Sequence, residues 1–485
     1  MHTALMMQNW RQVIYYKSFD NVIFDQTVRA YSRFEPPRVP LKGAYAGLGT
    51  NFLQLGDHFS PIHALLAPLY WVWDDMRMLF LAQAAIYAIT AAVVWRFTRS
   101  ILGVVPAYLV SIAFGVSWGL QSAMDVGYHE LDCAVLILAL IIERLYAGHH
   151  RQAAALAGML LLVKEEMGFL VAALGLLFFI RGHRWWGSGL AFAGVAWFAL
   201  ATKVFIPAFG GGSQQYWTYW SLGSGPVPAA KFALTHPWKL VELVVSTPEK
   251  RQLLLWLLAV VVGASLRSPI VLLALPSLTL RLLSDTYTYT TVHWQYNAPL
   301  MVIMLMAGVD GIARLAAWHS RWRERRGAGA NTPAPDDPPA DPPAAAPARA
   351  SRPLVWTWAI GVLAVAIYGC TTSLFAFSRL TEPDAWQQSA YQRAAVAVVD
   401  QIPANATVEA DDAIGVLISS RTQHLVLVDL KKLHGSQYVV LGAAPKITWP
   451  YSSRQQILDL KQDYLNHGYE EIWAQDDVWL LKRKD

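Results

Sequence analysis

The chain has 485 residues, of which 55% are hydrophobic and only 15% are charged, where soluble domains average about 25% charged residues. The net charge of +5 is too small and too evenly spread to indicate a nucleic-acid-binding face, and two cysteines exclude a disulfide framework or a cysteine-rich zinc site. Many apolar runs approach the roughly 20 residues that cross a bilayer. The composition therefore predicts an α-helical polytopic membrane protein and excludes a soluble enzyme.

The first 77 residues contain no apolar run of spanning length. We expect residues 1–77 to form an extracytoplasmic first loop with amphipathic helices. Residues 1–16 lack the long apolar core and the cleavage site of a signal peptide. We therefore expect the natural start to lie upstream and to supply a first span. The alternative is that the spans that follow translocate this segment.

Apolar runs after residue 77 predict about ten membrane crossings. Short or polar-interrupted runs are tolerated where they line a cavity inside the protein. The runs lie at 78–98, 101–120, 129–147, 152–165, 166–180, 187–206, 251–266, 268–283, 297–316 and 354–376.

Basic residues in the loops predict the orientation of these spans. One set of loops carries fourteen arginines, whereas the opposite loops between spans carry five basic residues. The Arg-rich side should be cytoplasmic. The first loop, the loops near 121–128, 207–250 and 284–296, and the C-terminal part of the chain then face outside the cytoplasmic membrane.

Composition divides the chain after the first loop into four parts. We expect a transmembrane helical core at 78–326, a disordered Pro/Ala-rich cytoplasmic linker at 327–350, a last span at 351–376 and an extracytoplasmic α/β domain at 377–485. The last part contains the strand-like runs ATVEA, HLVLVDL and QYVVLG, a helical run at 453–466, and then YEEIWA and DVWLLKR. No Gly-rich phosphate loop opens a helix there, so we expect a supporting or acceptor-binding role.

Ionisable and aromatic residues collect in loops on one side of the predicted membrane core. Such groups are costly at membrane depth and often mark function. In the Lys164–Glu165–Glu166 cluster, which lies between two apolar runs, the lysine should pair with one acid, and the second acid needs another partner or a solvated cavity. The further candidates are Asp20, Asp25, Glu35, Asp57, His58, His63, Asp125, His129, Glu130, Asp132, Asp285, His293 and Tyr296.

Several of these residues also have a purely structural interpretation. Asp20 and Asp25 could cap a helix, and His58 before a proline could belong to a helix-entry motif. Glu130 near a helix N-terminus is favoured by the helix dipole, and His293 could be an interfacial histidine. The convergence of four loops, more than any single residue, predicts a polar pocket.

The residue types in this pocket suit group transfer. A carboxylate can accept a proton from an acceptor hydroxyl, and cationic side chains can neutralise a leaving phosphate. Carboxylates with histidine could also bind a divalent cation, and oxygen-rich sets favour Mg²⁺ or Mn²⁺. The sequence contains no HExxH motif, P-loop, GxGxxG fingerprint after a strand or GxSxG elbow. ATP-driven chemistry and serine hydrolysis are therefore unsupported.

The segments SFDNVIFDQ, GDHFSPIHALLAPLY, GYHELD, VKEEMGF, IPANATVEADD and QYVVLG resemble the bacterial membrane family of domain of unknown function 2079. The resemblance runs from about residue 17 to the end, apart from the linker. That family looks like a branch of the GT-C glycosyltransferase superfamily, whose members use a polyprenyl-phosphate-linked sugar. The resemblance implies transfer of this sugar to a glycan or protein of the cell envelope, at the outer face of the bilayer.

The resemblance also implies roles for individual residues. Asp25 matches the acid of the first loop and would be the general base, with Asp20 as its substitute. His58 and Lys164 would face the lipid phosphate, and Asp57 could help to hold a cation. The residues that would hold sugar hydroxyls or shape the pocket are His129, Glu130, Glu165, Glu166, His293 and Tyr296.

Two other function classes compete with a glycosyltransferase. A transporter or flippase for a lipid-linked or small anionic solute often shows internal repeats and broken helices near mid-membrane. The sequence shows short spans but no repeat, and its polar groups lie at one face. A scaffold with a partner-binding outer domain gives no reason for the Lys164–Glu165–Glu166 cluster. The sequence therefore favours the transferase.

Overall fold

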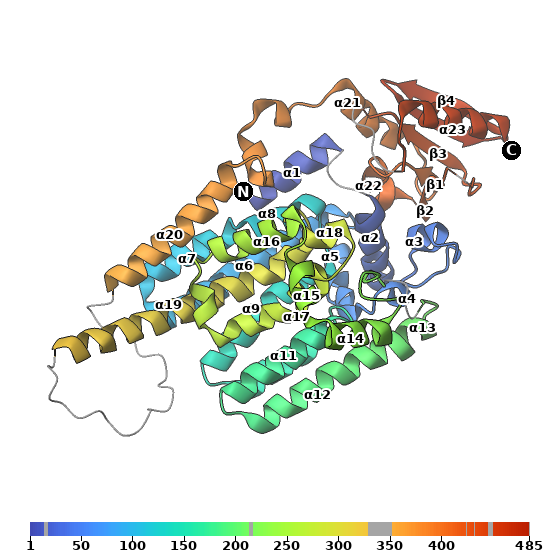
Figure 1. Cartoon of the computed structure of the whole chain (residues 1–485). Coiled ribbons are helices and arrows are strands. Elements are labelled where there is room, and N and C mark those ends of the chain that lie inside the picture. Colours follow the sequence, from blue (N-terminus) through green and yellow to red (C-terminus); the bar gives the residue numbers. More distant parts are fainter. Residues whose placement is uncertain are drawn as a thin grey trace.

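The structure is a computed structural model of the chain, drawn as a ribbon in Figure 1. The described residues are 1–13, 18–212, 217–327, 352–422, 424–430, 432–444 and 450–484. Most of the predicted 327–350 linker lies outside them.

The N-terminal segment forms short helices that pack on one end of a bundle of long helices (Figure 1). Pro40, Pro61 and Pro68 stand in the first turns of three of them, where a missing N–H costs nothing. The elements are α1 (His2–Gln12), α2 (Ser18–Ser32), α3 (Pro40–Tyr45), α4 (Gln54–Asp57), the 3₁₀ helix η1 (Pro61–Leu66) and α5 (Ala67–Val72).

The bundle follows from the apolar runs, and helical breaks divide several of them. Its first half contains α6 (Arg77–Leu102), α7 (Val104–Gly115), α8 (Trp118–Val126), α9 (Glu130–Tyr146), α10 (His150–Leu160), α11 (Met167–Ile180), α12 (Arg184–Leu200), the π-helix η2 (Ala201–Phe205) and α13 (Ile206–Ala208). Its second half contains α14 (Pro226–Thr235), α15 (Pro237–Val244), α16 (Pro248–Ala259), η3 (Ala264–Arg267), η4 (Pro269–Leu273), α17 (Ala274–Leu282), α18 (Tyr287–Thr290), η5 (Gln295–Asn297), α19 (Ala298–Gly327) and α20 (Arg352–Thr371).

Five helical segments among the described residues are long and apolar enough to cross a bilayer, and the multi-span helical fold is confirmed. Others are shorter, since α10 has 11 residues and α11 has 14. The figure of ten crossings and the orientation stay predictions. The five long segments are Arg77–Leu102, Val104–Val126, Arg184–Ala208, Tyr287–Arg323 and Arg352–Thr371.

Small residues let α11 and α12 pack at very short range. A Cβ atom at Gly168 would lie 2.4 Å from the carbonyl oxygen of Gly194, and one at Gly175 would lie 2.5 Å from that of Gly187. No side chain larger than hydrogen fits at such distances. The close pair supports α11, whose N-terminus carries Glu166.

The C-terminal part forms the predicted α/β domain, with a mixed five-stranded sheet in the order β2-β1-β3-β5-β4. Strands β1, β2 and β3 are parallel, and β4 and β5 complete the sheet in antiparallel pairing. All five strand-like runs and the helical run of the sequence are confirmed. The elements are η7 (Ala376–Thr381), η8 (Pro383–Trp386), α21 (Ala390–Ala397), η9 (Val398–Gln401), β1 (Thr407–Ala410), α22 (Gly415–Ile418), η10 (Ser419–Arg421), β2 (His424–Leu427), β3 (Tyr438–Gly442), α23 (Arg454–Asn466), β4 (Tyr469–Gln475) and β5 (Val478–Arg483).

The two faces of this sheet bury different neighbours. Alternate side chains of a strand point to opposite faces. Val439 and Leu441 of β3 pack with α23 in a small separate core. Val440, between them, joins the large core that continues into the helical bundle. The domain is therefore fused to the bundle through one face of its sheet.

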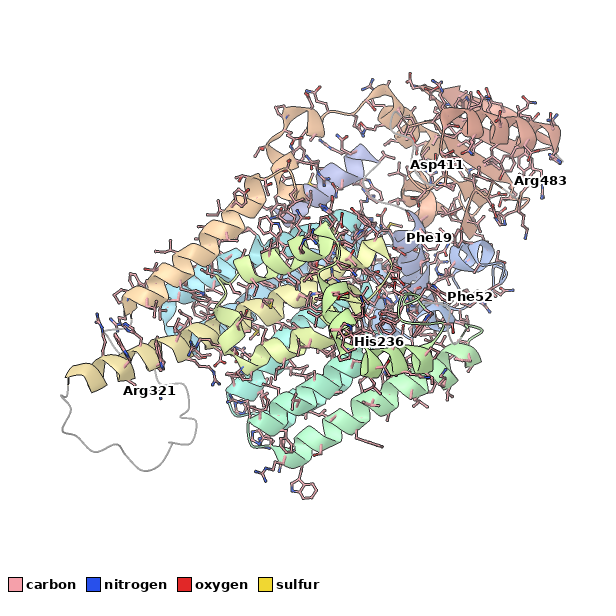
Figure 2. The ribbon with its side chains drawn as sticks, viewed as in Figure 1. Phe19, Phe52, His236, Arg321, Asp411 and Arg483 are labelled. Carbon is pink, nitrogen blue, oxygen red and sulfur yellow. The ribbon has the colours of Figure 1, made fainter. Side chains whose placement is uncertain are left out.

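Hydrogen bonds also tie α2 to this domain. The backbone N–H of Phe19 donates to Asp412 Oδ1 at 3.0 Å, and Gln26 Nε2 donates to the carbonyl oxygen of Leu425 at 3.0 Å. Figure 2 shows Phe19 on α2 beside the domain that carries Asp411 and Arg483. Residues nearly 400 positions apart in sequence thus fix the same helix.

The carboxylate of Asp25 is the buried centre of this attachment. Its side chain is fully enclosed and accepts hydrogen bonds from Arg29 Nη2 at 2.8 Å, from Tyr70 Oη at 2.7 Å and from Ser419 Oγ. The three donors come from α2, α5 and the C-terminal domain. The predicted catalytic acid Asp25 is therefore enclosed by three donors in the structure.

We predict that Asp25→Ala destabilises the protein by about 3–5 kcal/mol. The change removes the nearest acid of the buried Arg29, which keeps only the half-exposed Asp74 at 3.3 Å, and it takes this acceptor from the hydroxyls of Tyr70 and Ser419. The measurement is thermal unfolding of the purified protein in detergent. The matched control is Asp459→Ala on the exposed face of α23, which should unfold like the wild type. Equal stability of the two variants would contradict this scaffold role.

Candidate active site

A turn between α8 and α9 brings α2 against the start of α9. Gly127 in this turn has φ +93°, a conformation that side chains other than hydrogen strongly disfavour. Asn21 of α2 donates from Nδ2 to the carbonyl oxygen of Val126 at 3.0 Å, and a Cβ at Gly127 would lie 2.1 Å from its Oδ1. This contact sets Asp20, one residue earlier, beside His129.

Asp20 and His129 form the open end of a polar cluster. Asp20 Oδ2 lies 3.5 Å from His129 Nε2, and the side chain of Asp20 is 48% exposed while that of His129 is 4% exposed. His129 Nδ1 lies 3.0 Å from the carbonyl oxygen of Gly127, which can only accept, so this nitrogen carries a proton. The other ring nitrogen, Nε2, is the one that faces the carboxylate of Asp20.

Neighbouring charges keep Asp20 ionised. Burial and the charge of Glu130 favour the protonated acid, but the contact with His129 and the charge of Lys42 outweigh them. The pKa of Asp20 therefore lies below its usual value. An accessible carboxylate that is charged at neutral pH can accept a proton, or a hydrogen bond from a sugar hydroxyl.

Glu130 and Lys164 form the buried part of the same cluster. Lys164 Nζ lies 3.0 Å from Glu130 Oε1, and the two side chains are 8% and 5% exposed. Burying either charge alone would cost several kcal/mol, so each depends on the other. The lysine predicted for the lipid phosphate already has a carboxylate partner.

His58 and Glu165 join the loop after α4 to the turn before α11. His58 Nδ1 lies 2.8 Å from Glu165 Oε1, and the backbone N–H of Phe59 donates to Glu165 Oε2 at 3.1 Å. Burial and the charge of Lys164 lower the pKa of His58, but Glu165 and the charge of Asp57 outweigh them, so this pKa is raised. His58 is thus a partly shielded cation that is held by an acid.

Other predicted residues lie at the edge of the cluster or outside it. Asp57 Oδ1 lies 3.0 Å from Lys42 Nζ, so a chain cation already faces this carboxylate. His293 is exposed, and its backbone N–H donates to Thr291 Oγ1 at 3.4 Å. It does not line the pocket described below. The structure therefore brings together nine of the eleven predicted residues, and leaves out Asp25 and His293.

The acids of the cluster do not converge on a cation site. In the part of the chain that the structure describes, no three His, Cys, Asp or Glu side chains form a group that could hold a metal ion. Glu130, Glu165 and Asp57 each face a cation of the chain instead. We derive no step through Mg²⁺ or Mn²⁺.

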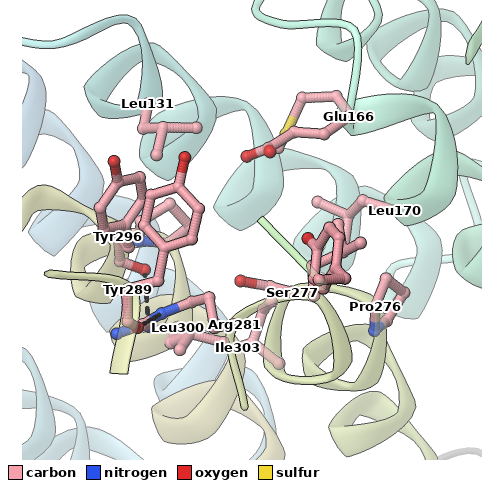
Figure 3. A pocket seen from close by; sticks show the side chains of 14 residues that line it. Leu131, Glu166, Leu170, Pro276, Ser277, Arg281, Tyr289, Tyr296, Leu300 and Ile303 are labelled. Carbon is pink, nitrogen blue, oxygen red and sulfur yellow. Dashed lines mark hydrogen bonds between the residues drawn. The ribbon is translucent and has the colours of Figure 1, made fainter. Parts of the chain in front are cut away.

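A pocket adjoins the cluster between α9, α11, α17, α18 and α19 (Figure 3). Tyr296 connects the pocket with the cluster. It lines the pocket, and the charges of Lys164, Asp20 and Glu166 act on its hydroxyl group. The carboxylate of Glu166 points into the pocket from one wall, and Arg281 lies on the opposite wall. The lining residues are Leu131, Glu166, Met167, Leu170, Tyr219, Pro276, Ser277, Leu280, Arg281, Tyr289, Tyr296, Pro299, Leu300 and Ile303.

Several polar residues of this region were not predicted from the sequence, among them Tyr219 and Ser277 of the pocket lining. Lys42 pairs with Asp57, whereas Arg281 and Tyr289 line the pocket. Arg281 stands inside the apolar run 268–283, and a charge at such a position is itself a sign of function. Tyr289 belongs to the aromatic loop that the analysis singled out for Tyr296. Nothing in the local sequence distinguishes Lys42 from a surface lysine.

We predict that the His58–Glu165 pair makes stability depend on pH. A raised pKa means that the folded state binds the proton more tightly, so the pair stabilises fully below about pH 6.5, and this stabilisation is lost as pH rises through the raised value. Thermal unfolding should show this loss in the wild type and a flatter profile in His58→Gln. His236→Gln, on an exposed histidine, should keep the wild-type profile. A profile that His58→Gln leaves unchanged would contradict the pairing.

Comparisons with known proteins give one family and several similar folds. ArnT from Cupriavidus metallidurans matches in the apo state with 11% identity and a TM-score of 0.48, over 99% of this chain and 96% of that one. Its structure bound to undecaprenyl phosphate matches with 12% identity and a TM-score of 0.49, over 99% and 97%. The archaeal oligosaccharyltransferase AglB from Archaeoglobus fulgidus, in complex with an inhibitory peptide and a dolichol-phosphate, matches with 12% identity and a TM-score of 0.38, over 87% and 63%.

No curated protein sequence matches the chain. The sequence model of the family described as "Predicted membrane protein (DUF2079)" matches residues 11–480, which is nearly the whole length. The chain therefore belongs to the DUF2079 family of predicted membrane proteins.

Proposed function

We propose that the protein is an integral membrane glycosyltransferase that moves a sugar from a polyprenyl-phosphate donor to a cell-envelope glycan or protein. The observation that carries this proposal is the position of Asp20. Its half-exposed carboxylate stands at the open end of a buried His–Glu–Lys cluster, and Tyr296 links that cluster to a largely apolar pocket. A base beside an apolar pocket suits a reaction between a lipid-linked donor and a polar acceptor.

The proposed reaction is a direct displacement at the anomeric carbon. An acceptor hydroxyl attacks this carbon while its proton moves to Asp20. The bond between the anomeric carbon and the phosphate oxygen breaks, and the polyprenyl phosphate leaves with the electron pair. Attack from the side opposite the leaving phosphate inverts the anomeric centre.

Asp20 takes the role of base because of its surroundings. Asp25 is enclosed by Arg29, Tyr70 and Ser419, so an acceptor has no access to it. His129 behind Asp20 holds the carboxylate toward the open side. Lys164 and Glu130 neutralise each other beside His129, so their buried pair supports the position of this histidine.

The proposal places this chemistry at the outer face of the cytoplasmic membrane. The arginine asymmetry of the loops assigns the end of the bundle with α2 and the C-terminal domain to that side. Polyprenyl phosphate can present its headgroup there while its chain stays in the bilayer. The C-terminal domain would then lie where an envelope acceptor arrives.

We predict that Asp20→Asn lowers sugar transfer by about 10²–10⁴-fold, because an amide cannot accept the hydroxyl proton. The assay follows labelled sugar from a panel of polyprenyl-phosphate donors in nanodiscs, with envelope extract as acceptor. The control is Asp384→Asn on an exposed acid, which should retain full activity.

Transfer that survives Asp20→Asn with an intact fold would refute the role of Asp20 as base. Absence of transfer with every donor, together with movement of a donor across the bilayer, would refute the transferase and support the transporter. Asp25→Asn should lower the thermal stability of the protein. The fraction that remains folded should lose little of its transfer activity.

A further inference from the structure

Arg281 is a buried cation whose position the backbone fixes. It retains 4% of its surface, and its Nε donates to the carbonyl oxygen of Tyr289 at 2.7 Å. Nη2 donates to the carbonyl oxygen of Thr291 at 3.1 Å, and Nη1 donates to that of Tyr296 at 3.3 Å. A guanidinium has five N–H donors, so these bonds leave two for a ligand.

The charge of Arg281 lacks an acid within ion-pair distance among the residues that the structure describes. Carbonyl oxygens satisfy part of its hydrogen-bonding capacity but cancel none of its formal charge. A buried charge without a counter-ion is costly and is tolerated when an anion completes it. The cluster's other cations differ, because His58, Lys42 and Lys164 each face a carboxylate.

Glu166 makes the two ends of the pocket electrostatically different, with an acid on one wall and a cation on the other. It lies on the wall opposite Arg281, and its side chain makes no hydrogen bond or ion pair among the described residues. A phosphate would be attracted to the arginine and repelled by the glutamate, whereas a sugar hydroxyl could donate to the glutamate. The two walls thus orient a ligand that carries both groups.

The rest of the pocket suits an apolar chain. Six aliphatic or thioether side chains line it alongside the polar residues, and ligand sites are typically lined mainly by such apolar side chains with a few polar groups. These apolar walls would add no binding free energy for a free inorganic anion. The apolar side chains are Leu131, Met167, Leu170, Leu280, Leu300 and Ile303.

We infer that Arg281 is the phosphate-binding group of this pocket, and that the pocket takes an amphiphile with a phosphate headgroup and an isoprenoid chain. This inference rests on the proposed function for the isoprenoid nature of the chain. It replaces His58 and Lys164 as the expected partners of the phosphate with a cation that has no acid within ion-pair distance among the described residues. Arg281 binds the donor and takes no part in proton transfer.

The test is binding of polyprenyl phosphate to the purified protein in nanodiscs, followed by native mass spectrometry and by competition. We expect Arg281→Gln to weaken binding at least about tenfold, the usual loss for a hydrogen bond to a charged group. Leu280→Trp fills the pocket without changing charge and should also abolish binding. Arg267→Gln, on an exposed arginine stacked over Trp318, should bind like the wild type.

Competitors identify the ligand. Polyprenol without phosphate, inorganic phosphate and phosphatidylglycerol should each compete far less than polyprenyl phosphate. Equal competition by polyprenol would overturn the role of Arg281, and equal competition by inorganic phosphate would overturn the role of the apolar walls. Equal competition by phosphatidylglycerol would make this a phospholipid site and overturn the isoprenoid assignment.

Binding also separates this inference from the proposed function. Polyprenyl phosphate that binds through Arg281, without any sugar transfer, would support the site and refute the transferase. Sugar transfer that Arg281→Gln leaves unchanged, with binding also unchanged, would support the transferase and refute the site. If Arg281→Gln does not fold, unchanged binding in Leu280→Trp overturns the inference.

Discussion

The buried carboxylate of Asp25 joins three parts of the chain that are far apart in sequence. It accepts hydrogen bonds from its own helix, from α5 and from Ser419 of the C-terminal domain. These contacts fix the position of helix α2, and Asp20 in its first turn therefore faces His129. An acid in the scaffold thus fixes the location of an acid at the surface of the site.

Pairing explains how so many charges can stand at one end of an apolar bundle. Glu130 with Lys164, Glu165 with His58 and Asp57 with Lys42 each combine one acid and one cation at 2.8–3.0 Å. Each pair joins different segments, so the polar cluster also holds the helices in register. Glu166 and Arg281 stand outside these three pairs and line the pocket, and Asp20 is half-exposed beside His129. The proposed chemistry uses these three charged groups.

The sequence was sufficient for the class of fold and for most members of the site. Apolar runs predicted the helices, and alternating β-rich runs predicted all five strands, because both patterns are local. The pocket was predicted from four loops on one side, since membrane topology alone brings alternate loops together. The family resemblance of the HFSP, HE and KEE segments pointed to the same residues.

The roles within the site could not be predicted in the same way. Asp20 and Asp25 lie five residues apart on one helix, about 140° around its axis, so only tertiary packing decides which one is buried. Glu165 and Glu166 are adjacent, yet one binds His58 and the other faces the pocket. Arg281 lies within an apolar run, and only the three-dimensional structure shows that none of the described acids stands within ion-pair distance of it.

The central claim is that a donor lies between Arg281 and Asp20. The most direct measurement is a cryo-electron microscopy structure of the protein in nanodiscs with a non-transferable polyprenyl-phosphate-sugar analogue. We expect density for the phosphate at the guanidinium of Arg281, for the sugar near Glu166 and Tyr296, and for the anomeric carbon on the side of Asp20. A headgroup bound elsewhere on the bundle, with this pocket empty, would contradict it.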